Sequence, residues 1–487
     1  MIPAWASSGT LTPATREPTR SRPSAACASR CARSDLSPPP GGLAPYDGDN
    51  LVWFAEHALL PRGVVRGCRI TVDAGRFVSV EPGGDPNGAQ RLPGVVLPGL
   101  ANAHSHAFHR ALRGRTHDAG GDFWSWRDAM YAVAEQLEPD SYFALARAAY
   151  AEMALAGVTA VAEFHYLHHG PGGRPYGDPN VMASALAQAA ADAGIRLTLL
   201  DTCYLAGGLD TAGHQPLAGA QLRFGDADAE SWATRRSAWT PPDGVTLGAA
   251  AHSVRAVPRD QLPTVVKAAE GAPLHVHVSE QPAENAATDA MYGCTPTTLL
   301  AEAGALGPSM TAVHATHVSV ADVDLLGASG TTVCLCPTTE RDLADGIGPA
   351  SALRDAGCTL ALGTDQHAVV DLLEEARALE SHERLASRQR GRFAPAELVA
   401  AMTAHSALGV PDAGRIEGGA RADLVAVRLD SVRTAGVDPA QVVLAASAAD
   451  VDTVVVDGRV VVAGGRHLLG DVGALLRDAI EPLWRDA

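Results

Sequence analysis

The sequence of 487 residues lacks the features that mark several large classes of protein. No apolar run approaches the roughly 20 residues that a membrane-spanning helix needs, so we expect no membrane insertion. The formal net charge of −17 opposes binding to nucleic acid or to an anionic membrane surface, which both require a positive field. The eight cysteines form no Cys-x-x-Cys module, a usage typical of reduced cytoplasmic proteins rather than disulfide-linked secreted ones.

Residues 1–44 lack apolar periodicity and are rich in Ser, Pro, Ala and Arg. This composition predicts a disordered extension. The segment is poor in acidic residues, as transit peptides are, but its repeated prolines oppose an amphipathic helix, and it has no continuous apolar core of a secretory signal. We therefore expect either a dispensable extension or a start codon placed too far upstream.

Eight short apolar runs, each ending in residues capable of chemistry, alternate with helical stretches such as "VMASALAQAAADAG". The runs are "GVVLPGLANAHSH", "GVTAVAEFHY", "IRLTLLDTCYL", "VTLGAAAHSVR", "PLHVHVSE", "MTAVHATHV", "TTVCLCPTTE" and "CTLALGTDQH". Eight alternating β/α units predict a TIM (β/α)8 barrel over residues 96–409, with its active site at the carboxyl ends of the strands. A doubly wound open sheet is the alternative, but no Gly-x-Gly-x-x-Gly follows an early strand.

Two further segments have the texture of short strands with tight turns. Apolar alternation broken by Gly and Pro runs through "GVVRGCRITVDAGRFVSVEPGG" and returns in "RADLVAVRLD" and "VDTVVVDGRVVVAGGRH". Because these segments flank the barrel, we expect a small β-sandwich domain built from residues 45–95 and 410–475.

Histidine is concentrated after the first run, where "NAHSHAFHR", from Asn102 to Arg110, holds three of them. His104 and His106 are two residues apart, so on a strand their side chains point to the same face and can hold one ion. His-x-His alone is a weak signal. Its strength comes from the histidines of "HVHVSE" and "VHATH" and the carboxylate of "GTDQH", which close the fifth, sixth and eighth runs. Three imidazoles and a carboxylate suit zinc or another divalent transition metal.

Four motifs in this order, at four strand ends, closely resemble the amidohydrolase superfamily in its mononuclear deaminase branch. There the first strand carries His-x-His, the fifth His-x-x-Glu, the sixth a His and the eighth an Asp. The resemblance extends from about residue 50 to 470. It implies one divalent ion, zinc with Fe2+ or Mn2+ as alternatives, held by His104, His106, His277 and Asp365.

The resemblance also separates neighbouring histidines. The His-x-x-Glu spacing selects His277 and leaves His275 as a residue that fills the barrel. His314 ends the apolar run of the sixth strand, which favours it over His317. His367 is interpreted as a surface-loop residue.

The implied reaction is the hydrolysis of a C=N bond. A bound zinc ion lowers the pKa of water towards about 7. Asp365 is expected to accept the proton of the water as general base, Glu280 to hold and protonate the substrate nitrogen, and His314 to position the nucleophile or stabilise the tetrahedral intermediate. Amide hydrolysis by a two-metal relative would usually require a carboxylated lysine, and the fourth run, "VTLGAAAHSVR", has no lysine.

Within the branch, the closest resemblance is to the deiminases that convert N-formimidoyl-L-glutamate to N-formyl-L-glutamate and ammonia in histidine degradation. It rests on "HSHAFHRALRG", "DFWSWRDAMY", "AEFHYLHH", "HSVRAV", "HVSEQPAE" and "TTERDLADGI". It implies a cytoplasmic homodimer with a small dianionic substrate. The expected substrate contacts are His109, Arg127, Tyr166, His252 and Arg255.

Three positions depart from that pattern. His109 replaces a glutamine, Gln366 replaces a small hydroxyl residue, and Arg341 replaces a small polar residue. These changes leave the metal ligands intact and affect only the expected substrate specificity. The alternative is a deaminase of a ring amidine such as guanine, cytosine or an adenosine derivative; an imidazolonepropionase and a metal-free scaffold protein are weaker alternatives.

Overall fold

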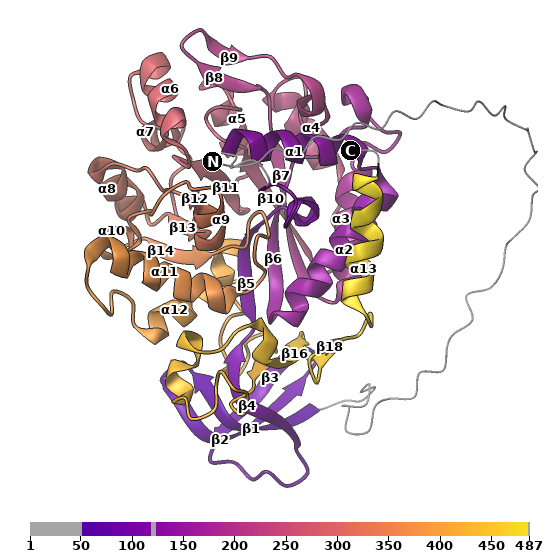
Figure 1. Cartoon of the computed structure of the whole chain (residues 1–487), viewed down its shortest axis with the longest axis vertical. Coiled ribbons are helices and arrows are strands. Elements are labelled where there is room, and N and C mark those ends of the chain that lie inside the picture. Colours follow the sequence, from indigo (N-terminus) through magenta and orange to yellow (C-terminus); the bar gives the residue numbers. More distant parts are fainter. Residues whose placement is uncertain (1–50, 118–122, 486–487) are drawn as a thin grey trace, which may run out of the picture. The chain divides into compact units, whose positions relative to one another are not determined.

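The computed structural model describes residues 51–117 and 123–485, so the expected extension at residues 1–44 lies outside the described residues. The eight predicted runs form one parallel sheet, shown between its helices in Figure 1. Its strands are β5 (Leu100–Ser105), β6 (Val158–His165), β7 (Arg196–Cys203), β10 (Val245–Ala251), β11 (Leu274–Val278), β12 (Met310–His314), β13 (Thr332–Leu335) and β14 (Thr359–Leu362). Since helices cover the sheet, most strand residues are apolar and buried on both faces.

The sheet closes into a barrel where β14 meets β5. The strand order runs β14-β13-β12-β11-β10-β7-β6-β5, and an isolated parallel bridge joins Ser105 to Asp365. At this seam a Cβ atom on Gly363 would lie 2.7 Å from the Cβ of His104, so only glycine allows the two backbones to approach. The predicted (β/α)8 barrel is confirmed.

Helices follow most of the strands and pack around the barrel (Figure 1). They are α1 (Phe123–Gln136), α2 (Pro139–Leu155), α3 (Val181–Ala193), α4 (Ala229–Ala238), α5 (Leu262–Ala268), α6 (Pro282–Tyr292), α7 (Pro296–Glu302), α8 (Val320–Ser329), α9 (Pro337–Asp342), α10 (Ala350–Asp355), α11 (Leu372–Ser387), α12 (Pro395–Met402) and α13 (Val472–Ile480). Local sequence sets their ends: α7 begins with Pro296 after the capping side chain of Thr295, and α3 ends at Gly194 in the left-handed conformation.

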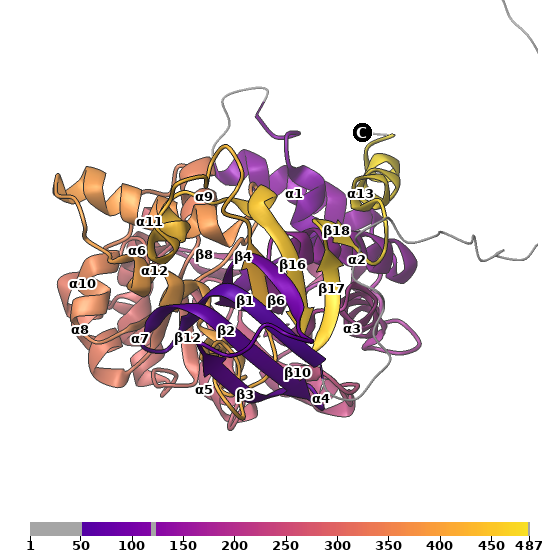
Figure 2. The same ribbon diagram turned by 90° about the horizontal axis from the view of Figure 1, so that it is seen from below.

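A second sheet of eight strands is built from both ends of the chain, in the order β18-β17-β16-β15-β4-β1-β2-β3. Its strands are β1 (Leu51–Leu60), β2 (Gly63–Asp73), β3 (Arg76–Pro82), β4 (Gln90–Pro98), β15 (Leu424–Val427), β16 (Val451–Val456), β17 (Arg459–Ala463) and β18 (Arg466–His467). Figure 2 shows the early strands beside β16 and β17. Trp53, Ile70, Phe77 and Leu424 belong to its own apolar core. The prediction of a small β domain from both termini is confirmed.

Short elements complete the barrel rim. They include the 3-10 helices η1 (Ala107–Leu112) and η3 (Gly219–Arg223) and the hairpin of β8 (Gly208–Asp210) and β9 (Gly213–Gln215). Within the described ranges, no helix combines the length and the apolar character needed to cross a bilayer. Six cysteines lie among the described residues, and none of the six forms a disulfide bond.

Candidate metal centre and active site

The four predicted metal ligands meet at the carboxyl end of the barrel. His104 lies at the end of β5, His106 follows it, His277 lies on β11, and Asp365 lies in the turn after β14. The Nε2 atom of His104 lies 3.0 Å from Nε2 of His277 and 3.4 Å from Oδ1 of Asp365. The Nε2 atom of His106 lies 3.5 Å from the same Oδ1. All four side chains are buried.

Hydrogen bonds behind the rings fix which nitrogen faces the centre. Nδ1 of His106 donates to the carbonyl of Phe164 over 2.9 Å, and Nδ1 of His277 donates to the carbonyl of His252 over 2.9 Å. A carbonyl only accepts, so each Nε2 carries a lone pair. Burial lowers the pKa of His106 to about 3 and holds the pKa of His277 well below its ordinary value. Both rings are therefore neutral at neutral pH, as metal binding requires.

The spacing of these atoms fits a divalent metal ion. Ligand atoms bound at 2.0–2.1 Å in a tetrahedral zinc site lie about 3.4 Å from one another. The separations between these ligand atoms, from 3.0 to 3.5 Å, fall close to that value. The buried Nδ1 of His104 has no hydrogen-bond partner among the described residues, so the group bound at Nε2 sets the orientation of the ring. Three imidazoles and a carboxylate therefore form a group that can hold one metal ion.

His314, at the end of β12, stands beside this group among three carboxylates. Its Nε2 lies 3.7 Å from Oε1 of Glu280 and 3.8 Å from Oδ2 of Asp365, and its Nδ1 lies 3.5 Å from Oε1 of Glu340. The backbone of His314 (φ 69°) and Asp365 (φ 43°) is left-handed, a strained conformation for residues with a side chain. Such strain is concentrated at functional sites.

The charges of these groups suit proton transfer. Burial alone would lower the pKa of His314, but Glu280, Glu340 and Asp365 raise it well above its ordinary value. Burial raises the pKa of Glu280, although His314 and Arg255 act against the rise. The arrangement therefore favours the protonated forms of both His314 and Glu280.

A pocket opens directly above the metal-ligand group and contains every predicted substrate contact. Its lining includes His109, Arg127, Tyr166, His252 and Arg255 together with Trp126, Met130, Tyr131, Tyr204 and Phe224. His109 lies on η1, and its ring is buried with Nε2 2.8 Å from the hydroxyl of Tyr166. The structure thus brings the two groups of predicted residues, metal ligands and substrate contacts, to one place.

The two arginines of the pocket differ in their partners. The guanidinium of Arg127 stacks 4.4 Å from the ring centre of Trp124, and among the described residues it has no carboxylate within ion-pair distance. Nε of Arg255 lies 3.3 Å from Glu284, and its Nη2 lies 3.7 Å from Glu280. Burial lowers the pKa of Arg255, but these two glutamates raise it above its ordinary value. Among the described residues, Arg127 is thus the pocket arginine without a carboxylate partner.

The three departures from the family pattern are not equivalent in the structure. Only His109 lines the pocket. Arg341 is exposed and pairs with Glu374 over 3.0 Å, and Gln366 donates to Asp342 over 2.9 Å. Two of the three departures therefore lie outside the substrate space.

Three further histidines that the sequence singled out, His275, His317 and His367, are not among the four metal ligands. Nε2 of His275 bonds to the carbonyl of Ala407 over 2.9 Å, and Nε2 of His317 bonds to the carbonyl of Asp345 over 2.8 Å. His367 is fully buried, so its interpretation as a surface-loop residue is wrong. The turn after β14 has left-handed backbone at His367 (φ 60°), and Nε2 of the ring lies 3.0 Å from the hydroxyl of Ser105.

Some residues of the site were not predicted. Glu340, on α9, contacts His314, and Glu284, on α6, contacts Arg255. Glu163, on β6, contacts Ser105 at the end of β5. A carboxylate at the end of the run "TTVCLCPTTE" was the available signal for Glu340. Glu163 and Glu284 stand in "AEFHY" and "HVSEQPAE" without a spacing that distinguishes them from ordinary residues.

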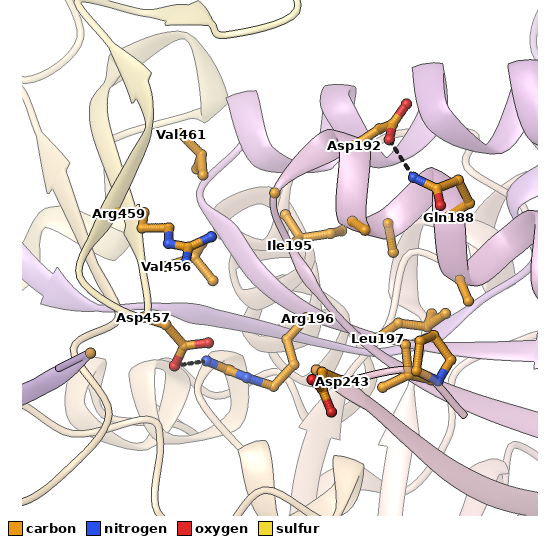
Figure 3. Close-up of a pocket in the computed structure, with 18 of the residues that line it drawn as sticks. Gln188, Asp192, Ile195, Arg196, Leu197, Asp243, Val456, Asp457, Arg459 and Val461 are labelled. Atoms are coloured by element: carbon orange, nitrogen blue, oxygen red, sulfur yellow. Dashed lines mark hydrogen bonds and ion pairs between the residues drawn. The ribbon is translucent and has the colours of Figure 1, made fainter. Parts of the chain in front are cut away.

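A larger cavity lies away from this group, and Figure 3 shows its lining. It is formed by α3, the first residues of β7 and β10, and the turn between β16 and β17. The arginine at its floor, Arg196, already pairs with Asp457 over 2.8 Å and with Asp423 over 2.8 Å. None of the predicted site residues lines it, so it is not the site of the chemistry.

Comparison with known proteins agrees with this geometry. Residues 95–461 match the model of the amidohydrolase family. A formimidoylglutamate deiminase from Pseudomonas aeruginosa is 40% identical over 347 residues, covering 70% of this chain and 76% of that protein. A 5-methylthioadenosine/S-adenosylhomocysteine deaminase from Halobacterium salinarum is 31% identical over 428 residues, covering 84% and 91%. The crystal structure of an amidohydrolase from Brucella melitensis superposes with a TM-score of 0.82 at 33% identity, covering 89% and 99%.

The family match covers most of the chain, and it includes both the metal-ligand group and the pocket above it. The chain belongs to the amidohydrolase family and is a metal-binding hydrolase that acts on C–N bonds.

Proposed function

We propose that the chain hydrolyses N-formimidoyl-L-glutamate to N-formyl-L-glutamate and ammonia, a step of histidine degradation. The observation that carries this proposal is the presence of two guanidinium groups, Arg127 and Arg255, in one small pocket above the metal-ligand group. Arginine binds carboxylates with paired hydrogen bonds, and this substrate has two carboxylates beside its formimidoyl group. The 40% identity to a formimidoylglutamate deiminase supports the same assignment.

Each arginine is assigned one of the two carboxylates. Arg127 and the hydroxyl of Tyr166, oriented by its hydrogen bond to His109, bind one of them. Arg255 binds the other, with the ring of His252 as a further donor. Because burial holds the pKa of His252 well below its ordinary value, that ring donates as a neutral imidazole.

A bound divalent ion, for which we propose one zinc per chain, supplies water activated at neutral pH. Asp365 accepts a proton from the attacking water. The water oxygen bonds to the formimidoyl carbon while Glu280 protonates the terminal nitrogen. The proton held by Asp365 then passes to the same nitrogen, the bond between that nitrogen and carbon breaks, and ammonia leaves. The hydroxyl group on the carbon returns its proton to Glu280 and becomes the formyl oxygen. The cationic ring of His314, 3.7 Å from Glu280, stabilises the negative charge that develops at the reacting carbon's oxygen.

The test is a coupled assay of ammonia release from N-formimidoyl-L-glutamate, guanine, cytosine, adenosine and 5-methylthioadenosine. We expect turnover of the first compound and at most trace release from the others. Glu280→Gln should retain its metal and lose about 100- to 10,000-fold in kcat, because it removes the proton donor. Efficient turnover of a nucleobase or nucleoside without activity on N-formimidoyl-L-glutamate would overturn the proposal.

A second candidate is deamination of an adenosine derivative. The rings of Trp126, Tyr166, Tyr204 and Phe224 line the same pocket and could stack on a purine. The relative with this activity is 31% identical, against 40% for the deiminase, and a neutral nucleoside leaves Arg127 without a charge partner among the described residues. The same assay of ammonia release distinguishes between these two candidate functions.

We further propose that the enzyme is a cytoplasmic homodimer. The proposal follows from the family resemblance and from the reduced cysteines of the described chain. Light scattering of the purified protein gives the mass directly, and a mass of about one chain, 50.3 kDa, would contradict the dimer.

A further inference from the structure

A buried carboxylate lies behind the metal-ligand group, outside the pocket. Glu163, on β6, is fully buried and does not line the substrate space. Its Oε1 accepts the backbone N–H of Ala107 over 2.6 Å, and its Oε2 accepts the hydroxyl of Ser105 over 2.7 Å. These two donors stand immediately before and after His106 in the chain. One carboxylate therefore holds the backbone on both sides of a metal ligand.

The contact extends through Ser105 to the turn that carries Asp365. The hydroxyl of Ser105 has a single proton, which it donates to Glu163, so Nε2 of His367 donates to its oxygen over 3.0 Å. The backbone makes the same connection, because the N–H of His106 donates to the carbonyl of Asp365 over 3.2 Å. Glu163 is thus joined to the segments that bear three ligands.

The pairing of the strands explains why a side chain is needed here. Between β5 and β6 the register runs Asn102 to Val161 and then Ser105 to Glu163, so β5 has one residue more than its partner. The register is irregular over this interval, which contains His104. A bulge interrupts the ladder and redirects a side chain. The carboxylate of Glu163 supplies hydrogen bonds to Ser105 at the end of β5 and to Ala107 at the start of η1, directly after the point where the backbone ladder is broken.

We propose that Glu163 is a positioning residue of the metal centre. It fixes the bulged end of β5 and, through Ser105 and His367, the turn bearing Asp365, and it thereby sets the affinity of the site for its divalent ion. The inference concerns metal binding alone, so it does not depend on which substrate the enzyme uses. Partners that orient metal ligands typically change metal affinity by about 10- to 100-fold when they are removed.

The chain contains a matched control. Glu383, on α11, is buried and accepts the backbone N–H of Ser351 over 2.9 Å and its hydroxyl over 2.8 Å. The donors are of the same two kinds, but they join α11 to α10, away from the metal ligands. Glu163→Gln and Glu383→Gln each keep the size of the side chain and replace one acceptor oxygen by a donor. Both should lower the unfolding temperature.

The decisive measurement is the dissociation constant for Zn2+, obtained by competition with a chromophoric chelator on the full-length protein. We expect Glu163→Gln to weaken Zn2+ binding about 10- to 100-fold and Glu383→Gln to leave it within about 2-fold of wild type. Ser105→Ala keeps the bond to Ala107 and should weaken binding less than Glu163→Gln.

Equal Zn2+ affinities for Glu163→Gln and wild type would overturn the proposal and leave Glu163 with a purely structural role. If Glu163→Gln does not fold, Ser105→Ala decides, because it removes the bond between Ser105 and Glu163 and with it the connection to His367. An unchanged Zn2+ affinity in Ser105→Ala then rejects the inference. The Zn2+ measurement does not involve turnover. A failure of the proposed activity on N-formimidoyl-L-glutamate would therefore leave this test unaffected.

Discussion

The Nε2 atoms of His104 and His277 face each other at 3.0 Å, although the residues are 173 positions apart. Burial lowers the pKa of both imidazoles, so an imidazolium does not hold the pair together at neutral pH. Asp365 lies 3.4 Å from the same atom of His104. A divalent cation shared by the two rings and the carboxylate satisfies all three groups.

Removal of one ligand should abolish metal binding. We expect His104→Ala to retain less than about one tenth of the wild-type metal after dialysis, because the three ligands left no longer surround the ion. Elemental analysis of the purified variant measures this directly. His317→Gln is the matched control, since His317 bonds to the carbonyl of Asp345. Full metal content in His104→Ala would exclude it as a ligand.

Arg127 should determine affinity for an anionic substrate. It is the pocket cation without a carboxylate partner among the described residues, so Arg127→Met leaves a substrate carboxylate unpaired. A charged hydrogen bond contributes about 1.5–3 kcal/mol, so KM should rise about 10- to 100-fold while metal content stays unchanged. Steady-state kinetics with N-formimidoyl-L-glutamate tests this, with Arg259→Met, an exposed pair with Glu302, as control. An unchanged KM would show that Arg127 does not bind the substrate.

The sequence was sufficient to predict the barrel and to predict that the expected metal ligands meet at one end of it. Apolar runs and their polar ends mark the strands and the face at which they meet, so His104, His106 and Asp365 could be placed together. The family resemblance then selected His277 over His275, and His275 instead bonds to the carbonyl of Ala407.

The residues that hold the ligands were not predictable in the same way. Glu163 contacts Ser105 across 58 positions, and nothing in the local sequence encodes that contact, which arises from the register of two strands at a bulge. His367 was misinterpreted because its burial depends on a left-handed turn after β14. The 3-10 helix η1, which carries His109, was not predicted.

Stability should fall as the solution becomes acidic, because several buried histidines are held neutral. Burial lowers the pKa of His106 and His275 to about 3 and that of His168 to about 4. The unfolded chain binds protons at about pH 6.5 and the folded chain does not, so stability is lost as pH falls below that value. Each group adds up to about 1.4 kcal/mol per pH unit to the slope.

The metal-free protein tests this, by urea unfolding between about pH 7.5 and about pH 5. His275→Gln can keep the hydrogen bond to Ala407 and removes one titrating group, so its free energy of unfolding should vary less steeply with pH. A slope identical to that of wild type would show that His275 is not held neutral.

Arg223 should act on the pocket from a distance. This fully buried guanidinium donates to the carbonyls of Ala134, of Leu137 over 2.6 Å and of His169 over 2.9 Å. It thereby ties the end of α1, the helix that carries Arg127, to the loop after β6, which carries Tyr166. We expect Arg223→Ala to lower the unfolding temperature and to raise KM about 10-fold, with a smaller effect on kcat.

A general loss of stability must be separated from this positioning effect. Arg196→Ala removes another buried guanidinium, one that pairs with Asp423 at the opposite end of the barrel, and should lower the unfolding temperature without changing KM. Methylguanidinium added to Arg223→Ala should lower its KM towards the wild-type value, because the ion can reoccupy the cavity and restore donors to the three carbonyls. A similar KM in both arginine variants, without rescue, would show that Arg223 contributes only to folding.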